Sequence, residues 1–262
     1  MRSSHTATIL VSAALFAAPP LRPAICFVDD VPAATLLLPY FEVDVDDPNG
    51  INTLMSINNA SADGVLAQVA LWTDLGVATF NFSVYLTGYD VQVISLRDIF
   101  RGAAPRTASA GQDPSDTISP KGAFSLDVDF PSCAGQLPPP PIPGSFVTHL
   151  RAAHSGQFSS ILNGCTGRNL GDGIFRGYVT VDVMNRCSLM FPGDPGYFAA
   201  GGTGDASNRN VLWGDYYYID SNLGISQGDT LVHIEASFKN PETSSPGQQT
   251  FYGRFVNWSA ID

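Results

Sequence analysis

Hydrophobic and polar residues alternate with a period of two along much of the chain. In Thr79–Leu86 the alternation places four apolar side chains on one face, namely Phe80, Phe82, Val84 and Leu86. Segments 177–183 and 231–238 repeat the pattern, with these side chains directed inward: Val179, Val181 and Val183, then Val232, Ile234, Ala236 and Phe238. Because successive side chains of a strand point to opposite faces, the pattern is typical of half-buried strands.

Further short apolar segments complete the set of predicted strands: 34–43, 52–58, 65–73, 90–96, 123–129, 210–219 and 249–258. Clusters of turn-forming residues separate many of them, as in Asp47–Gly50. One helix is predicted over 145–154, with Ser145 as its N-cap. Many short strands with frequent turns predict an all-β fold, an antiparallel β-sandwich with at most this one short helix.

The composition divides the chain into three parts. Residues 31–101 form an N-terminal strand set, and residues 145–262 form a C-terminal set. Between them, 102–144 is an excursion rich in Pro, Gly and Ser that holds one predicted strand and the stiff run Pro138–Pro141. The two sets form either one large sandwich with a shared core or two packed lobes, and the composition of the excursion slightly favours two lobes.

The first residues have the layout of a secretory signal peptide. Arg2 precedes an apolar run over 8–18, which Pro19 and Pro20 end. The run is shorter than the roughly 20 apolar residues of a membrane-spanning helix. We therefore expect residues 1–24 to be removed on export, leaving an extracellular, cell-surface or periplasmic protein without a transmembrane segment.

The charge of the chain limits the classes of partner that we expect it to bind. The formal net charge is −11 at pH 7, and loss of Arg2 and Arg22 with the leader makes the mature chain more acidic still. Such a chain repels phosphate backbones, so nucleic acid is not an expected partner. The expected partner is an unidentified protein or glycan, although the acidity is also explained by solubility alone.

The chain has four cysteines: Cys26, Cys133, Cys165 and Cys187. No CxxC spacing occurs, and disulfides are the expected fate of cysteines after export. Of the possible pairings we favour Cys133–Cys165, because these two cysteines flank the proline-rich excursion. In the chain-entropy description, closing that loop contributes roughly 3–4 kcal/mol. Cys26 and Cys187 are then either paired or free.

The segment Asp44–Gly50 resembles a calcium loop. Asp44, Asp46, Asp47 and Asn49 place oxygen atoms before a turn-forming glycine, which is a pattern that calcium sites use. Pro48 occupies the third ligand position, however, and no bidentate glutamate follows. The alternative interpretation is a turn stabilised by Asp and Asn side chains. Calcium is the one cofactor that the sequence suggests.

The sequence evidence for a catalytic motif is weaker than that for the calcium loop. Gly224-Ile-Ser-Gln-Gly228 matches the G-x-S-x-G pattern of serine hydrolases, but that motif requires a strand, a sharp turn and then a helix. Because a strand is predicted to follow, we interpret the segment as a glycine-rich hairpin loop and assign no catalytic residue. His149, His154 and His233 lack the spacing of a metal site, and we interpret them as structural.

Four aromatic residues lie close together in the sequence: Trp213, Tyr216, Tyr217 and Tyr218. On a rigid sheet, exposed aromatic rings can stack against sugars or partner side chains. The alternative is that they pack in the core.

The sequence also resembles a group of secreted bacterial proteins without an assigned activity. The similarity lies in segments 34–43, 56–61, 71–74, 82–90, 172–182 and 210–215. The resemblance implies export and a β-sandwich, and it assigns no functional residues. The similar sequences continue past residue 262, which suggests that this chain is a fragment.

The leading interpretation is therefore a secreted, non-catalytic β-sandwich protein with a binding or structural role outside the cell or at its surface. One alternative is a secreted hydrolase on a β scaffold, whose paired carboxylates the many aspartates would allow. The other is a calcium-dependent adhesin or glycan-binding module.

Overall fold

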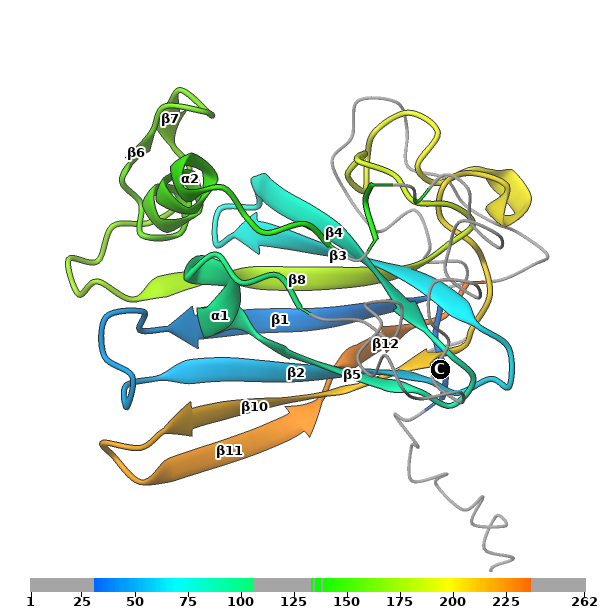
Figure 1. The fold of residues 1–262 in the computed structure, drawn as a ribbon, viewed down its shortest axis with the longest axis horizontal. Coiled ribbons are helices and arrows are strands. Elements are labelled where there is room, and N and C mark those ends of the chain that lie inside the picture. The colour runs from blue at the N-terminus through cyan, green and yellow to red at the C-terminus, as the bar shows by residue number, and fades with distance from the viewer. Residues whose placement is uncertain (1–30, 106–132, 134, 138, 237–262) are drawn as a thin grey trace, which may run out of the picture.

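The computed structural model describes residues 31–105, 133, 135–137 and 139–236. Within these residues, two antiparallel sheets pack face to face, as the sequence predicted (Figure 1). The predicted signal peptide, Cys26 and the strands predicted over 123–129 and 249–258 lie outside the described residues.

The first sheet has the strand order β12-β1-β8-β3-β4, with every neighbouring pair antiparallel. Its strands are β1 (Thr35–Val43), β3 (Val65–Thr73), β4 (Ala78–Leu86), β8 (Phe175–Met184) and β12 (Val232–Ile234). Strand β8 pairs with β1 on one side and with β3 on the other (Figure 1). The sheet therefore mixes early and late strands, because β8 lies between β1 and β3 and β12 lies beside β1.

The second sheet has the order β11-β10-β2-β5, and a short strand β9 pairs with the end of β2. Its strands are β2 (Asn52–Asn59), β5 (Val91–Ser95), β9 (Leu212–Trp213), β10 (Asp215–Asp220) and β11 (Ile225–Thr230). The other elements are helices α1 (Leu96–Phe100) and α2 (Gly144–His154), the small hairpin β6 (Phe158–Ser159) and β7 (Gly164–Cys165), and a 3₁₀ turn over Ala200–Gly202. Among the described residues, no helix is both long and apolar enough to cross a bilayer.

One hydrophobic core fills the space between the sheets. Most residues predicted to face inward belong to it, namely Phe82, Val84 and Leu86 of β4 and Val179, Val181 and Val183 of β8, while Phe80 is partly buried against it. Met55 and Ile57 of the second sheet face them. Strands from 35–95 and from 175–234 thus lie in both sheets and contribute to this core. Of the segment between them, Ile142 belongs to the core and Ala104 packs against it.

A third layer covers the outer face of the first sheet. The segment 185–208, which follows β8, folds back over this face and buries a second apolar cluster. The members of that cluster include Leu66, Tyr85, Met184, Tyr197 and Phe198. Residues of β3 are consequently buried on both faces of the sheet.

Two predicted strands have different bounds in the structure. The strand predicted over 210–219 is broken at Gly214, where the backbone lies so close to Ser56 that an added Cβ would be 2.3 Å from its carbonyl oxygen. Of the strand predicted over 231–238, residues 237–238 lie outside the described residues, and the described part pairs over Val232–Ile234. Val232, predicted to face inward, is exposed on this edge strand. Residues 225–230, predicted to be partly a loop, form β11.

The helix predicted over 145–154 is confirmed, but its predicted cap is wrong. Helix α2 begins at Gly144, and its N-cap is Pro143, which makes no side-chain capping bond. The carbonyl of Pro143 accepts hydrogen bonds from the amides of Phe146 and Val147 instead. Proline fixes an extended entry into the helix, so Ser145 falls inside the first turn.

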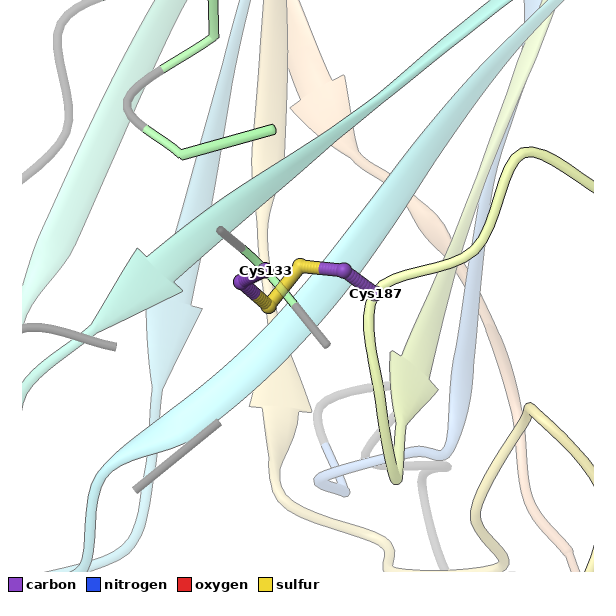
Figure 2. Close-up of a disulfide and its surroundings, with 2 residues drawn as sticks. All are labelled: Cys133 and Cys187. Carbon is purple, nitrogen blue, oxygen red and sulfur yellow. A yellow bond between two sulfur atoms is a disulfide. The ribbon is translucent and has the colours of Figure 1, made fainter. Parts of the chain in front are cut away.

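The predicted disulfide partner is also wrong. Cys133 pairs with Cys187, and Cys165 is an exposed free thiol on β7. Figure 2 shows the two sulfur atoms joining the chain around Cys133 to the loop that follows β8. The physical reason is the third layer, which brings Cys187 onto the outer face of the first sheet, whereas Cys165 lies in the hairpin beside α2.

Replacing both Cys133 and Cys187 by alanine should lower the free energy of unfolding by about 4 kcal/mol, because the bond closes a loop with a sequence separation of 54. Guanidinium denaturation measures the loss. Cys165→Ala is the matched control and should change stability by less than about 0.5 kcal/mol. Peptide mapping that found Cys133 joined to Cys165 would contradict the pairing.

Candidate functional site

An apolar groove lies between β4 and the proline-rich segment that leads into α2. Its volume is about 380 Å³, within the range of small-molecule sites. Three phenylalanines provide aromatic walls, Phe80 and Phe82 from β4 and Phe146 from α2. The opposite wall is the run 139–143, which consists of four prolines and Ile142. None of the described residues that line the groove carries a charge.

The walls of the groove are held by specific contacts. The ring of Phe80 lies 5.4 Å from that of Phe82 and 5.5 Å from that of Phe146, measured between centroids. The amide of Ile142 donates to the carbonyl of Gly102 at 3.2 Å, which ties the proline run to the end of α1. Proline has no N–H, so the run adds almost no hydrogen-bond donors to the groove.

The disulfide joins two further parts of the wall. Cys187 is followed by Ser188 and Leu189, and Cys133 is followed by 135–136, and all four of these residues line the groove. The side chain of Asn81 on β4 donates to the carbonyls of Leu189 and Met190, both at 3.0 Å. These bonds fix the third layer against the edge strand.

A row of buried polar side chains runs across the first sheet toward the groove. Register pairs place Thr35, Asp182, Gln68 and Ser83 on four adjacent strands. Asp182 accepts hydrogen bonds from the hydroxyls of Thr35 and Tyr197. Ser83 lines the groove, and its hydroxyl has no hydrogen-bond partner among the described residues. The wall of the groove is therefore mainly apolar, and Ser83 is one of four polar residues in it, with Asn81, Gln136 and Ser188.

Two buried histidines attach α2 to the body of the fold. Because a carbonyl oxygen only accepts, Nδ1 of His154 donates to Arg176 O at 2.8 Å, which leaves Nε2 unprotonated in the neutral ring. Nε2 lies 2.9 Å from the Thr79 hydroxyl, which also lies 3.1 Å from the Leu71 carbonyl. The His154 ring also packs on Phe41 and Phe100. Burial lowers the pKa of His154 to about 4. The sequence interpretation of His154 as structural agrees with this position.

His149 lies one turn earlier on α2. Its Nδ1 is 2.6 Å from the hydroxyl of Ser159, and its ring meets Phe146 with 5.0 Å between centroids. Burial also lowers the pKa of His149. Both histidines thus pack as neutral rings behind the wall of the groove.

The predicted calcium loop, Asp44–Gly50, joins β1 to β2 and contains a cation supplied by the protein itself. Arg97 of α1 extends its guanidinium group into the loop and donates to four backbone carbonyls. These belong to Asp44 at 2.8 Å, Pro48 at 2.6 Å, Gly50 at 2.6 Å and Ile51 at 3.1 Å. Arg97 is 9% exposed, and its burial lowers its pKa without removing its charge.

The carboxylates of the loop bind its own backbone. Asp44 accepts from the amides of Asp46 and Asp47, and Asp47 accepts from the amide of Asn49 and the side chain of Asn222. The bond from Asn49 holds the pKa of Asp47 below its usual value. Among the described residues, no three His, Cys, Asp or Glu side chains are grouped as metal ligands. The contacts favour the alternative interpretation, a side-chain-stabilised turn, and the calcium site stays a prediction.

The G-x-S-x-G segment does not form the turn that a hydrolase requires. Ser226 lies inside β11, paired with Ile219 of β10, and only Gly224 belongs to the preceding turn. The hairpin-loop interpretation was therefore correct for Gly224 and wrong for Ser226. Within the described part of the chain, no hydrogen bond joins Ser226 to Asp229 or His233.

The four aromatic residues do not form one platform. Tyr216 packs against the core, and the Tyr218 hydroxyl donates to the carbonyl of Tyr40. Tyr217 points the other way and covers Gly228, where an added Cβ would be 2.4 Å from its ring. Trp213 belongs to β9 and meets His233 edge-on. The alternation of β10 thus separates side chains that are adjacent in sequence.

Sequence reasoning missed both the groove and Arg97. Three parts of the groove were recognised in the sequence as a strand or a proline-rich run, namely Phe80, Phe82 and 139–143. Nothing in the local sequence indicated that they face one another. Arg97 lies 46 to 53 residues from the carbonyls it binds.

Replacing Arg97 by methionine should lower the free energy of unfolding by about 3–5 kcal/mol, because four loop carbonyls lose their donors. Urea denaturation provides the measurement. Arg168→Met removes an arginine whose side chain is 71% exposed and should cost less than about 1 kcal/mol. Equal losses in the two variants would contradict the proposed role of Arg97.

The two interpretations of the Asp44–Gly50 loop give opposite results in a melting experiment. With Arg97 occupying the loop, we expect the same melting temperature in excess calcium and in EDTA. Calcium bound only to the folded state at 100 times its dissociation constant would add about 2.7 kcal/mol and raise the midpoint by several degrees. Such a rise, if lost in Asp44→Asn, would restore the calcium site.

Searches against protein-family models, curated proteins and solved structures find no match to this chain.

Proposed function

We propose that this protein is an exported, non-catalytic binding protein that holds an uncharged, largely apolar group in the groove between β4 and 139–143. The observation that carries the proposal is the lining, which combines three phenylalanine rings and a proline run with no described charged residue. Apolar pockets with a few polar groups are the usual form of a binding site for small molecules. The hydroxyl of Ser83 is one of the few polar groups in the wall.

The walls of the groove are held in place, which supports the binding of a ligand in a preformed site. The disulfide, the Asn81 bonds and the Ile142 amide hold three separate segments around the same space. A rigid, preformed cavity reduces the ordering that binding would otherwise require. The disulfide and the predicted leader together support export, because disulfides persist in oxidising compartments.

Nile red, an uncharged apolar dye, is the probe for the groove. Leu189 lines the groove, and Leu189→Glu places a carboxylate against an apolar ligand, so we expect dye affinity to fall by about tenfold or more. Dye fluorescence titration provides the measurement.

The matched control is Leu223→Glu. Leu223 is 70% exposed, close to the 74% of Leu189, and does not line the groove. This variant should bind the dye like the wild type. Equal affinity of both variants, or no dye binding by the wild-type protein, would contradict the proposed function.

A further inference from the structure

The groove shares its wall with the helix that the buried histidines hold in place. Phe146 is in the first turns of α2, and the 139–143 run leads directly into the helix. The ring of Phe146 contacts Phe80 on one side and His149 on the other. Thr79, whose hydroxyl contacts His154, is the chain neighbour of Phe80. The wall and the histidine contacts therefore depend on the same docked position of α2.

We propose that His154, with His149 beside it, makes the groove acid-labile: protonation releases α2 from the sheet and removes one wall of the binding site. This inference rests on the proposed function and names the regulation of the same site.

The docked position accommodates a neutral His154 and opposes a charged one. Its ring is enclosed by Phe41 and Phe100, which offer no polar atom to a charged imidazole. A proton on Nε2 only reverses the contact with Thr79, whose hydroxyl then donates to the Leu71 carbonyl, so this contact supplies no negative charge. Among the described residues, no carboxylate forms a hydrogen bond to either histidine ring. An imidazolium in this position would therefore lose its hydration without gaining a counter-ion.

The surrounding charged groups do not change this balance. The titratable groups around His154 on its own and the adjoining elements are Asp74, His149, Arg151, Arg168 and Arg176. Asp74 favours the charged ring, but it is paired with Arg168. The Arg176 guanidinium binds Glu42 and Asp172, and Arg151 donates to the carbonyl of Phe100. His149 disfavours a second charge.

The direction of the pH dependence follows from the lowered pKa of His154, about 4 when docked against about 6.5 when released. Docking is fully favoured above pH 6.5, and it is progressively lost as the pH falls from 6.5 through 4. The equilibrium for release of α2 should rise by about 25-fold between pH 7.5 and pH 5.0.

Hydrogen exchange of the amides of 150–155 in the full chain, corrected for intrinsic rates, measures this release at the two pH values. We expect their protection to fall by about 25-fold at pH 5.0 in the wild type, while β3 and β8 stay protected. In His154→Gln, which is neutral at both pH values, the protection should not change with pH. Nile red affinity should fall in acid for the wild type and stay level for the variant.

Equal protection of α2 at both pH values in the wild type overturns the inference, even if His154→Gln does not fold. An equal loss in the variant also overturns it, because the loss would then come from other groups. If the dye fails to bind at pH 7.5 while protection falls as expected, the acid-dependent release of α2 is supported and the proposed function is wrong.

Discussion

The pairing of β8 with both β1 and β3 is the interaction on which the rest of the molecule depends. It inserts a late strand between two early ones, so the first sheet is incomplete until residues 175–184 have joined it. The same strand contributes Val179, Val181 and Val183 to the central core, and its continuation forms the third layer. Contacts this distant in sequence are slow to form, because the entropy of closing a long loop must be offset first.

The alternation of side chains made the strands and the core predictable. Phe82, Val84 and Leu86 face the core as their spacing requires, since burial along a strand depends on a period that the sequence displays directly. Even where the bounds were wrong, as at Gly214, the cause was a contact with a distant strand, the Ser56 carbonyl. Local pattern specifies which face of a strand is buried, but not which strand lies beside it.

The candidate site was much less predictable, because the contacts that build it join residues that are far apart in the sequence. The sequence showed that Cys133 needs a partner, but the choice of Cys187 depends on how the segment 185–208 folds over the sheet. Phe80 and Phe146 form one wall only because α2 docks at the edge strand. The side-chain oxygens of the β1–β2 loop suggested calcium, whereas the contact of Arg97 with the backbone carbonyls of the loop could be found only in the tertiary structure.

The position of Arg97 has a consequence for how the β1–β2 loop responds to its surroundings. A free ion binds according to its concentration in solution and leaves on dilution or chelation. A guanidinium group tethered through the backbone has a fixed local concentration that no change of medium alters, so long as β5 and α1 are folded. Order in this loop is therefore tied to the integrity of the second sheet. The turn keeps its shape for as long as that sheet is folded.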